Sequence, residues 1–504
     1  MKLDLKGRKF CIYIRICVIT SLCVSMLCTG CAGSVNTENV SATANEADNA
    51  NQADTSYDLI TAKNLLNHGI ELPKSDTKVY VNQSGYVVGR EKLVYFSGEA
   101  YGEKFNIRRV SDDEIVYSAK IEALNKGNAG NKDTDISGQN EEKKHHNFDE
   151  TLAIGIFTDF DEVGEYYIET DVIGQSYKFN IAQDTYEQIF MGLLKNISEE
   201  PLQDSAQGVC DVSFGMHILL HSLECNGSLY EEAYKHIDSE YAESEMIPQL
   251  LYIAKWLMSR QAENGSVYDS YEATAAFCGI INMCRDNFGK YDKTIADEYQ
   301  SAVKKAWEWL ELSSCSTEEE KYARFYAATQ LYSSENNEKY GAIIDDFLKN
   351  YTEAYTKNRF VYYGVLTYLS IERNLDRDMC THIMQSLVDD TEKICNAAIE
   401  DKILGIGKRG IQENLDTILL MGLTNYLTPN KEYTVIIENS IQYMGGLNEE
   451  GKCYLGKDGI WINSDYTAQR NLEWTGIMLF GFSDMLKNFS DMQSETLEIN
   501  IDNP

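Results

Sequence analysis

The sequence predicts a β-sandwich followed by a ring of α-helices, and three observations lead to this fold class. Between 78 and 183, short segments alternate apolar and polar residues and end at Gly or Asp, which is typical of strands. Between 184 and 490, apolar residues recur at helical spacing. Only 5 prolines occur among 504 residues, which favours a largely helical body because proline breaks helices. We therefore expect a multidomain β + α protein.

The charge balance excludes one class of function. The chain has 45 Lys and Arg against 79 Asp and Glu, a formal net charge of -34. Such a chain repels phosphate backbones and lacks the basic patch that nucleic-acid binding requires. We therefore expect no nucleic-acid partner.

The first 30 residues have the pattern of a secretory signal. Basic residues precede the apolar run Ile16 to Cys28, which is too short to span a membrane comfortably. The run leads into Leu-Cys-Thr-Gly-Cys, which resembles the bacterial lipobox, so we expect lipidation at Cys31 and an anchor on the extracytoplasmic face of a bacterial cell membrane. An ordinary signal peptide or an N-terminal membrane anchor is the alternative. Residues 31–77 are polar and acidic and predict a flexible tether.

The cysteine and histidine patterns indicate no metal centre. Five of the 13 cysteines lie at or before Cys31, and the other eight contain no C-x-x-C pair. His217 and His221 have the i, i+4 spacing of a metal-binding pair, but their segment is apolar and offers no third ligand, so we interpret them as packing or helix-surface residues. No carboxylate cluster has the ligand spacing of a calcium site. The sequence predicts neither a metal nor another cofactor.

The individual strands and helices follow from the same patterns. Residues 125–147 are polar and Gly-rich and predict a surface loop within the sandwich. About twelve helical segments suit six hairpins closed into an α/α toroid, although periodicity alone leaves an open solenoid or a bundle as alternatives. The expected strands are Lys78–Gln83, Lys92–Phe96, Phe105–Val110, Leu152–Ile156, Gly164–Glu169 and Gln175–Ile181. The expected helices are Tyr186–Lys195, Gly215–Glu224, Ile247–Gln261, Ala273–Cys284, Ile295–Leu312, Glu320–Tyr332, Ile343–Tyr355, Val361–Ile371, Met379–Ile399, Asn414–Tyr426, Tyr433–Tyr443 and Leu472–Leu486.

Several motifs resemble a known family. Val-Asn-Gln-Ser-Gly-Tyr at Val81–Tyr86 resembles the opening of the immunoglobulin-like domain that precedes the catalytic domain in many glycoside hydrolase family 9 cellulases, and Gly164–Ile168 resembles that domain's late strand. Tyr443–Asn448 and earlier helical segments are similar to successive family segments in the same order. The resemblance covers residues 78–488. The domain bounds that it implies are 78–183 for an immunoglobulin-like β-sandwich, 184–490 for an (α/α)6 toroid and 491–504 for a C-terminal tail.

Catalysis in that family needs two carboxyl groups on opposite faces of the scissile sugar, roughly 6.5 to 9.5 Å apart. The resemblance implies a base within Gly-Gly-Trp-His-Asp-Ala-Gly-Asp, but the nearest stretch here, Cys210–Leu219, has Asp211 as its only carboxylate. The implied acid aligns with Gln469, an amide that does not donate a catalytic proton usefully, and Glu473 stands about one helical turn later. The family's His-His-Arg loop, expected after Asn448, is absent from the sequence.

The expected loop ends of the helical part carry the candidate sugar-binding residues. Aromatic faces stack on sugar rings, and charged or amide side chains form hydrogen bonds with sugar hydroxyls. The aromatic candidates are Trp461, Tyr466, Trp474, Tyr454 and Tyr268, and the polar candidates are Asp458, Asp465 and Arg470.

Three hypotheses for function follow. The favoured one is a lipid-anchored protein that resembles a family 9 cellulase, binds a polysaccharide or oligosaccharide and has lost or severely reduced hydrolase activity. The first alternative is a divergent hydrolase of β-glucan-type polysaccharide, with Asp211 or Asp465 as base and Glu473 as acid. The second alternative is a structural or protein-binding lipoprotein in which the toroid is only a scaffold.

Overall fold

The computed structural model contains a part built from β-strands and a larger part built from helices, so the predicted β + α class is confirmed. The expected signal, lipidation site, tether and surface loop (1–30, Cys31, 31–77 and 125–147) lie outside the described residues. The described residues are 78–98, 101–123, 152–195, 197, 200, 202–235, 246–290, 292–371, 375–401, 403–455 and 471–501.

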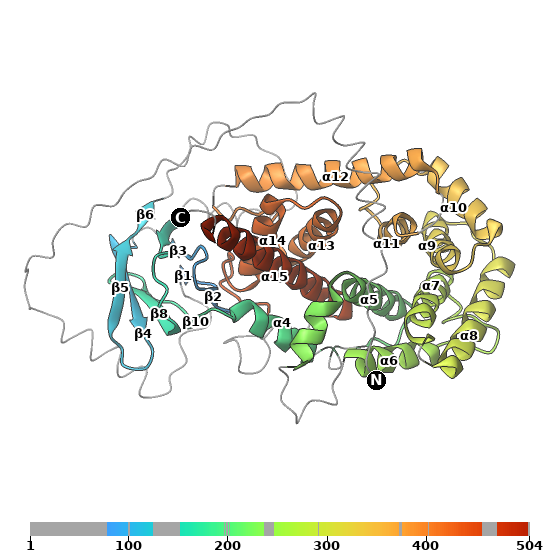
Figure 1. Cartoon of the computed structure of the whole chain (residues 1–504), viewed down its shortest axis with the longest axis horizontal. Coiled ribbons are helices and arrows are strands. Elements are labelled where there is room, and N and C mark those ends of the chain that lie inside the picture. The colour runs from blue at the N-terminus through green and yellow to red at the C-terminus, as the bar shows by residue number, and fades with distance from the viewer. Residues whose placement is uncertain are drawn as a thin grey trace, which may run out of the picture.

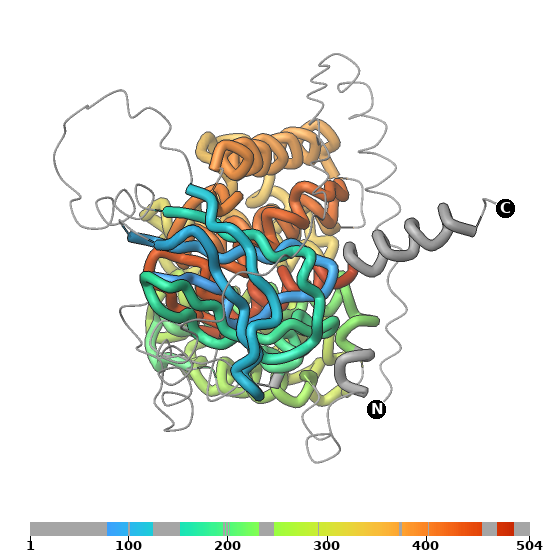
Figure 2. Tube along the Cα trace, turned by 90° about the vertical axis from the view of Figure 1, so that its left-hand side faces the viewer, coloured from blue at the N-terminus to red at the C-terminus, as the bar shows by residue number. Residues whose placement is uncertain are grey.

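The β part consists of two sheets with one apolar core between them. One sheet has the strand order β1-β3-β7-β6 and the other β2-β10-β8-β4-β5, with β9 paired to β8. The rings of Phe96 and Phe105, one from each sheet, lie 5.7 Å apart between their centroids. Figure 2 shows the strands lying across one side of the helical part. The finer classification as immunoglobulin-like stays a prediction. The strands are β1 (Val79–Tyr80), β2 (Tyr86–Val87), β3 (Leu93–Ser97), β4 (Lys104–Arg109), β5 (Ile115–Lys120), β6 (Glu122–Ala123), β7 (Leu152–Ile156), β8 (Gly164–Thr170), β9 (Gly174–Gln175) and β10 (Phe179–Ala182).

The helical part is a ring of helical hairpins (Figure 1), which is one of the three arrangements that the periodicity alone left open. The odd-numbered helices form the inner layer, in which α7 packs between α5 and α9, and α15 packs between α13 and α5. Within the described residues, no helix combines the length and the apolar character needed to cross a membrane. The helices are α4 (Thr185–Lys195), α5 (Ala206–Lys235), α6 (Met246–Met258), α7 (Tyr271–Phe288), α8 (Lys293–Leu312), α9 (Glu318–Ser334), α10 (Glu338–Asn350), α11 (Arg359–Leu369), α12 (Arg377–Glu400), α13 (Ile411–Leu427), α14 (Lys431–Met444) and α15 (Leu472–Ile501).

The inner helices all begin at one end of the ring, which we call the entry face. It comprises the first two turns of α5, α7, α9, α11, α13 and α15 and the described residues of the loops that precede them. Local sequence fixes several of these starts, because Ser270 accepts a hydrogen bond from the Ala273 amide and Thr317 forms a capping box with Glu320. Asn358 accepts from two amides at the start of α11. The loops also contact one another, since Arg260 pairs with Asp204 at 2.9 Å across the loops before α7 and α5.

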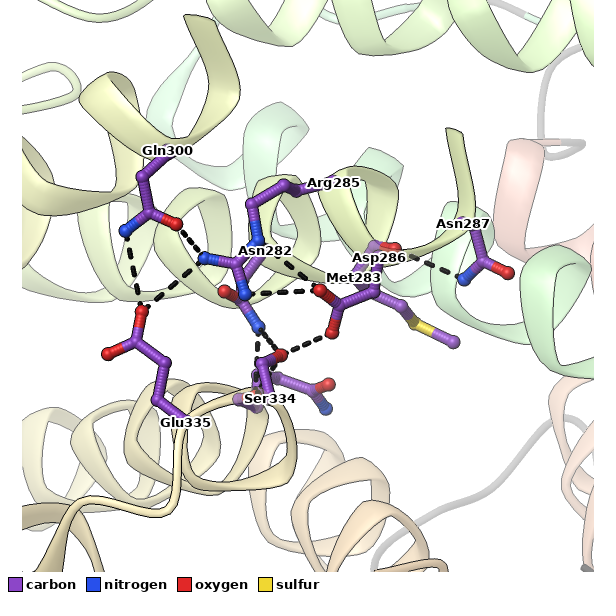
Figure 3. Close-up of polar contacts among 9 residues, drawn as sticks. Asn282, Met283, Arg285, Asp286, Asn287, Gln300, Ser334 and Glu335 are labelled. Carbon is purple, nitrogen blue, oxygen red and sulfur yellow. Dashed lines mark hydrogen bonds and ion pairs between the residues drawn. The ribbon is translucent and has the colours of Figure 1, made fainter. Parts of the chain in front are cut away.

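The opposite end of the ring, the exit face, is held by a polar network at the C-terminal ends of α7 and α9 (Figure 3). Arg285 of α7 contacts Asp286, Gln300 of α8 and Glu335 just after α9. The Ser334 hydroxyl donates to the other oxygen of Asp286. Each charged group therefore has partners within the network, which ties the C-terminal ends of α7 and α9 to each other and to α8.

The two motifs that carried the family resemblance contact each other across the β and helical parts. The Gln83 amide nitrogen of the main chain donates to the Gly445 carbonyl at 2.8 Å, and its side chain donates to the Gly451 carbonyl at 2.7 Å. A side chain on Gly445 would collide with Asn82, and Gly446 has a φ of +125°, which favours glycine. Asn82 itself bridges its own loop by donating to the Gly85 carbonyl at 2.7 Å. These residue types are therefore explained by docking, which agrees with a structural role for Asn82.

Candidate functional site

The candidate residues predicted from the sequence divide into two groups. Among the described ones, Asp211 lies in the second turn of α5 and Glu473 in the first turn of α15, and Tyr268 and Tyr454 lie in the loops before α7 and α15. All of them, with Trp474, belong to the entry face. The candidates that lie outside the described residues are Asp458, Trp461, Asp465, Tyr466, Gln469 and Arg470.

Glu473 is buried and its carboxylate is fully engaged. Its side chain is only 2% exposed, and one carboxylate oxygen pairs with the Arg359 guanidinium. The Tyr363 hydroxyl donates to the other oxygen at 3.0 Å. Burial raises the pKa of Tyr363, so this hydroxyl remains protonated and available as a donor. A cation and a hydroxyl donor both favour the ionised carboxylate.

Asp211 lies one helical turn from the place where α5 and α15 touch. A Cβ on Gly215 would come within 2.6 Å of the Glu473 amide nitrogen, so the two helix backbones are in close contact there. Asp211 accepts a hydrogen bond from Gln207 at 2.9 Å. Among the described residues, no hydrogen bond or ion pair connects Asp211 with Glu473.

Tyr454 and Trp474 are part of the apolar core. Tyr454 is 5% exposed and Trp474 is 3% exposed, and both belong to the main cluster of buried side chains. This conformation therefore does not allow the predicted stacking of their rings on sugar, because neither ring presents a face to solvent. Their periodic apolar surroundings in the sequence indicate packing equally well.

Tyr268 is the aromatic candidate that the described structure leaves accessible. Tyr268 is 42% exposed. It lies in a tight turn in which Tyr268 and Asp269 have φ values of +53° and +49°. Both values lie in the left-handed region, which is costly for residues other than glycine. The Tyr268 hydroxyl donates to Asp204, which also pairs with Arg260. The ring of Tyr268 is therefore exposed and held in a strained turn beside a charged pair, and its contact with sugar stays a prediction.

Two further residues of the entry face were not singled out from the sequence. Arg359, at the start of α11, is 39% exposed while its partner Glu473 is buried. Asp416 of α13 is exposed, yet desolvation by the surrounding protein raises its pKa, and this rise is opposed by a hydrogen bond from Gln412 and by the charge of Arg359. Nothing local marks either residue, because each is an ordinary charged residue near a helix start.

The histidines of α5 are packing residues, as predicted. Burial lowers the pKa of His217 to about 3 and that of His221 to about 4, so both are neutral near pH 7. The His217 ring lies 4.8 Å from that of Tyr363 and its Nδ1 lies 3.2 Å from the Tyr326 hydroxyl. Within the part of the chain that the structure describes, no group of three or more His, Cys, Asp or Glu side chains could hold a metal ion.

Comparison with solved structures supports the fold prediction. The chain aligns with a metagenome-derived glycoside hydrolase family 9 endoglucanase with a TM-score of 0.62 and 14% identity, over 81% of this chain and 98% of that one. A thermostable endoglucanase from Alicyclobacillus acidocaldarius gives 0.60 and 13%, over 82% and 100%. A family 9 protein from Bacteroides ovatus gives 0.58 and 13%, over 81% and 98%.

The chain has a family 9-like fold. Identities of 13–14% establish this likeness in fold and nothing more about chemistry. No protein-family model and no curated protein matches the sequence. The family 9-like toroid therefore carries an entry face whose residues have to be judged by their own geometry.

Proposed function

We propose that this protein binds neutral β-glucan chains or oligosaccharides at the entry face and that its hydrolase activity is lost or severely reduced. The family 9-like fold supports a glycoside hydrolase-like protein, and one similar structure is a complex with a cellobiose-like isofagomine. In this proposal the β part is an immunoglobulin-like module that supports the toroid. Cys31 carries a lipid that anchors the exported chain to the bacterial cell membrane.

The pairing of Glu473 with Arg359 is the observation that carries the proposal. A general acid must hold a proton before it can protonate the leaving oxygen. The carboxylate of Glu473 accepts from Tyr363 and pairs with Arg359, which favours its ionised form. Since the aligned acid position is Gln469 and no Asp-Ala-Gly-Asp motif occurs, neither half of the inverting pair is supported.

A binding assay run beside a reducing-sugar release assay tests this function. The full chain is titrated with cellohexaose and with xyloglucan and mixed-linkage oligosaccharides, and product release is measured on the same samples. We expect binding without release. Release that disappears in Glu473→Gln would overturn the proposed loss of activity, and the absence of binding to every glucan would overturn the proposed binding role.

A divergent hydrolase is the second candidate, and the contact between α5 and α15 favours it. Because Gly215 touches the backbone of Glu473, Asp211 and Glu473 project from neighbouring inner helices at the same face. Two carboxyl groups from neighbouring elements are the minimum that inversion requires. Release of sugar by the full chain, lost in both Asp211→Asn and Glu473→Gln and kept in Glu335→Gln at the exit face, would establish this alternative.

The lipid anchor is tested separately. Cys31→Ser should move the protein from the membrane fraction into the soluble fraction, because the thiol that would carry the lipid is absent. Unchanged membrane association of that variant would contradict lipidation at this residue.

A further inference from the structure

We propose that Arg359 is a glycan-contacting residue of the entry face, which uses its remaining N–H groups to bind the hydroxyl oxygens of a neutral hexopyranose. This inference rests on the proposed binding function and deepens it by naming a residue and a sugar class. It depends on the asymmetric burial of an ion pair, on the donors left over and on the position of a neighbouring carboxylate.

The ion pair has one end inside the protein and the other at its surface. Glu473 is 2% exposed and Arg359 is 39% exposed. A carboxylate buried in this way is costly to desolvate, and such a pair often adds little or nothing to stability. What the pair does provide is a guanidinium held in one place at the entry face.

Arg359 is fixed on both its backbone and its side chain. Asn358, immediately before it, accepts hydrogen bonds from the Phe360 and Val361 amides and donates to Glu319 of α9 at 2.8 Å. The start of α11 is thereby tied to the start of α9. Tyr363, one turn after Arg359, holds the second oxygen of Glu473 and so prevents the carboxylate from rotating away.

The guanidinium has donors to spare. Arginine carries five N–H groups in a planar fork. Among the described residues, the Arg359 side chain donates to one acceptor, Glu473, through the Nη1 atom of Arg359. The other N–H groups are therefore available to acceptors from solvent or from a ligand, and a preorganised fork loses little conformational entropy when it binds one.

Asp416 supplies a carboxylate acceptor at the same face of the ring. It is exposed on α13, and Arg359 is close enough to oppose the rise of its pKa that desolvation causes. A fixed cationic donor and a carboxylate acceptor at one face suit the hydroxyls of a sugar ring, each of which both donates and accepts. Arg359 and Asp416 come from different inner helices, α11 and α13, so they share this face only in the folded ring.

The charge of the molecule favours an uncharged sugar. The chain has a formal net charge of -34, and Asp416, Glu413 and Glu319 lie on the same face as Arg359. An anionic glycan would meet this field as well as the charge of Arg359, which is already paired with Glu473. We therefore expect neutral β-glucan to bind and galacturonate chains not to bind.

Isothermal titration of the full chain with cellohexaose, and with an oligogalacturonide of equal length, tests the inference. Arg359→Lys keeps the charge but lacks the planar fork, and should weaken cellohexaose binding about tenfold. Arg359→Gln alone leaves Glu473 charged and buried without its partner, which endangers folding. The double variant Arg359→Gln/Glu473→Gln avoids that problem and should weaken binding about 100-fold while it remains folded by circular dichroism.

Lys357→Gln is the matched control, because Lys357 forms an exposed ion pair with Glu353 only two residues away from Arg359. It should leave the affinity within about twofold of the parent. If the parent binds cellohexaose and the two Arg359 variants bind equally well, this inference is overturned and the proposed function stands. A parent that binds neither sugar overturns both, and an Arg359-dependent preference for the oligogalacturonide overturns the neutral class.

Discussion

The two ends of the helical ring use charge in different ways. At the exit face, the Arg285 side chain is 12% exposed and contacts Asp286, Gln300 and Glu335. Its charge is therefore paired within the surrounding network. At the entry face, Arg359 is more exposed and pairs with one buried carboxylate. The difference shows that the first arrangement serves to join helices, whereas the second leaves a positioned charge facing solvent.

The largest difference between the two faces should appear in Arg359→Met. The variant leaves Glu473 charged and uncompensated in a buried position, and removing one partner of such a pair costs about 3 kcal/mol of unfolding free energy. An uncompensated buried carboxylate has a raised pKa in the folded state, so the stability of the variant should fall as the pH rises from about 5 to about 8. Urea unfolding at both pH values measures this.

Lys357→Met provides the control for that measurement, because both members of its ion pair are largely exposed. Its loss should stay below about 0.5 kcal/mol at either pH. If Arg359→Met loses as little, or loses the same amount at both pH values, Glu473 is not held as a buried charge and the contrast between the faces disappears.

In the interior between the two faces, His217 should make the stability of the protein depend on pH. Burial lowers the pKa of His217 to about 3, whereas an unfolded histidine has a pKa near about 6.5. The unfolded state therefore binds more protons in this window, and the stability present above about pH 6.5 is lost as the pH falls toward 3. The loss is up to about 1.4 kcal/mol per pH unit.

His217→Phe should remove the share of this acid sensitivity that His217 contributes, since phenylalanine does not titrate and keeps a ring beside Tyr363, whereas the share of His221 remains. The slope of unfolding free energy against pH between about 6 and about 4.5 should decrease by roughly one proton. An unchanged slope would mean that His217 is protonated without cost in the folded protein.

Arg285→Met should have a smaller effect, and on stability alone. Its partners Asp286 and Glu335 are each more than a third exposed, so solvent can replace part of what the network loses. We expect a loss of about 1 kcal/mol in urea unfolding and no change in cellohexaose affinity. A change in affinity would show that the exit face is coupled to binding, and the two faces could no longer be treated as independent.

The smallest stability effect is expected from Tyr268→Gly at the entry face. Glycine relieves the left-handed strain at φ +53°, so stability should stay equal or rise by up to about 1 kcal/mol. Glucan affinity should nevertheless fall several-fold, by an amount of order 1 kcal/mol, because the exposed ring is removed. Asp269→Gly, at φ +49°, relieves similar strain and keeps the ring. Equal affinities of these two variants would exclude Tyr268 from the binding face.

Much of the fold could be predicted from local pattern. The segment expected at Lys92–Phe96 is strand β3 at Leu93–Ser97, and that expected at Ile295–Leu312 lies within helix α8. Such elements are recognisable because burial on one side imposes a period on the sequence. The bounds of α5 and α15 were predicted less well. Both helices are longer than the expected segments, Gly215–Glu224 and Leu472–Leu486, because they extend past the apolar residues on which the prediction rested.

The candidate site was predicted less completely, and Arg359 shows why. Arg359 and Glu473 are separated by 114 positions, and neither residue is unusual at the start of a helix. Likewise, Tyr454 and Trp474 were predicted to be exposed aromatic residues at loop ends, but both are buried in the folded ring. Side-chain accessibility at a loop end depends on which other loops meet there, and no local pattern encodes that.

The sequence by itself determined the strand and helix segments, the acidic charge and the absence of the expected catalytic motifs, because these depend on residue type and spacing along the chain. Only the tertiary structure decided that Val81–Tyr86 docks on Tyr443–Asn448 through Gly445, and that Glu473 is paired with Arg359. The physical reason is that burial and charge pairing are set by neighbours in space, and a ring brings its first, fourth and last inner helices together only when it closes.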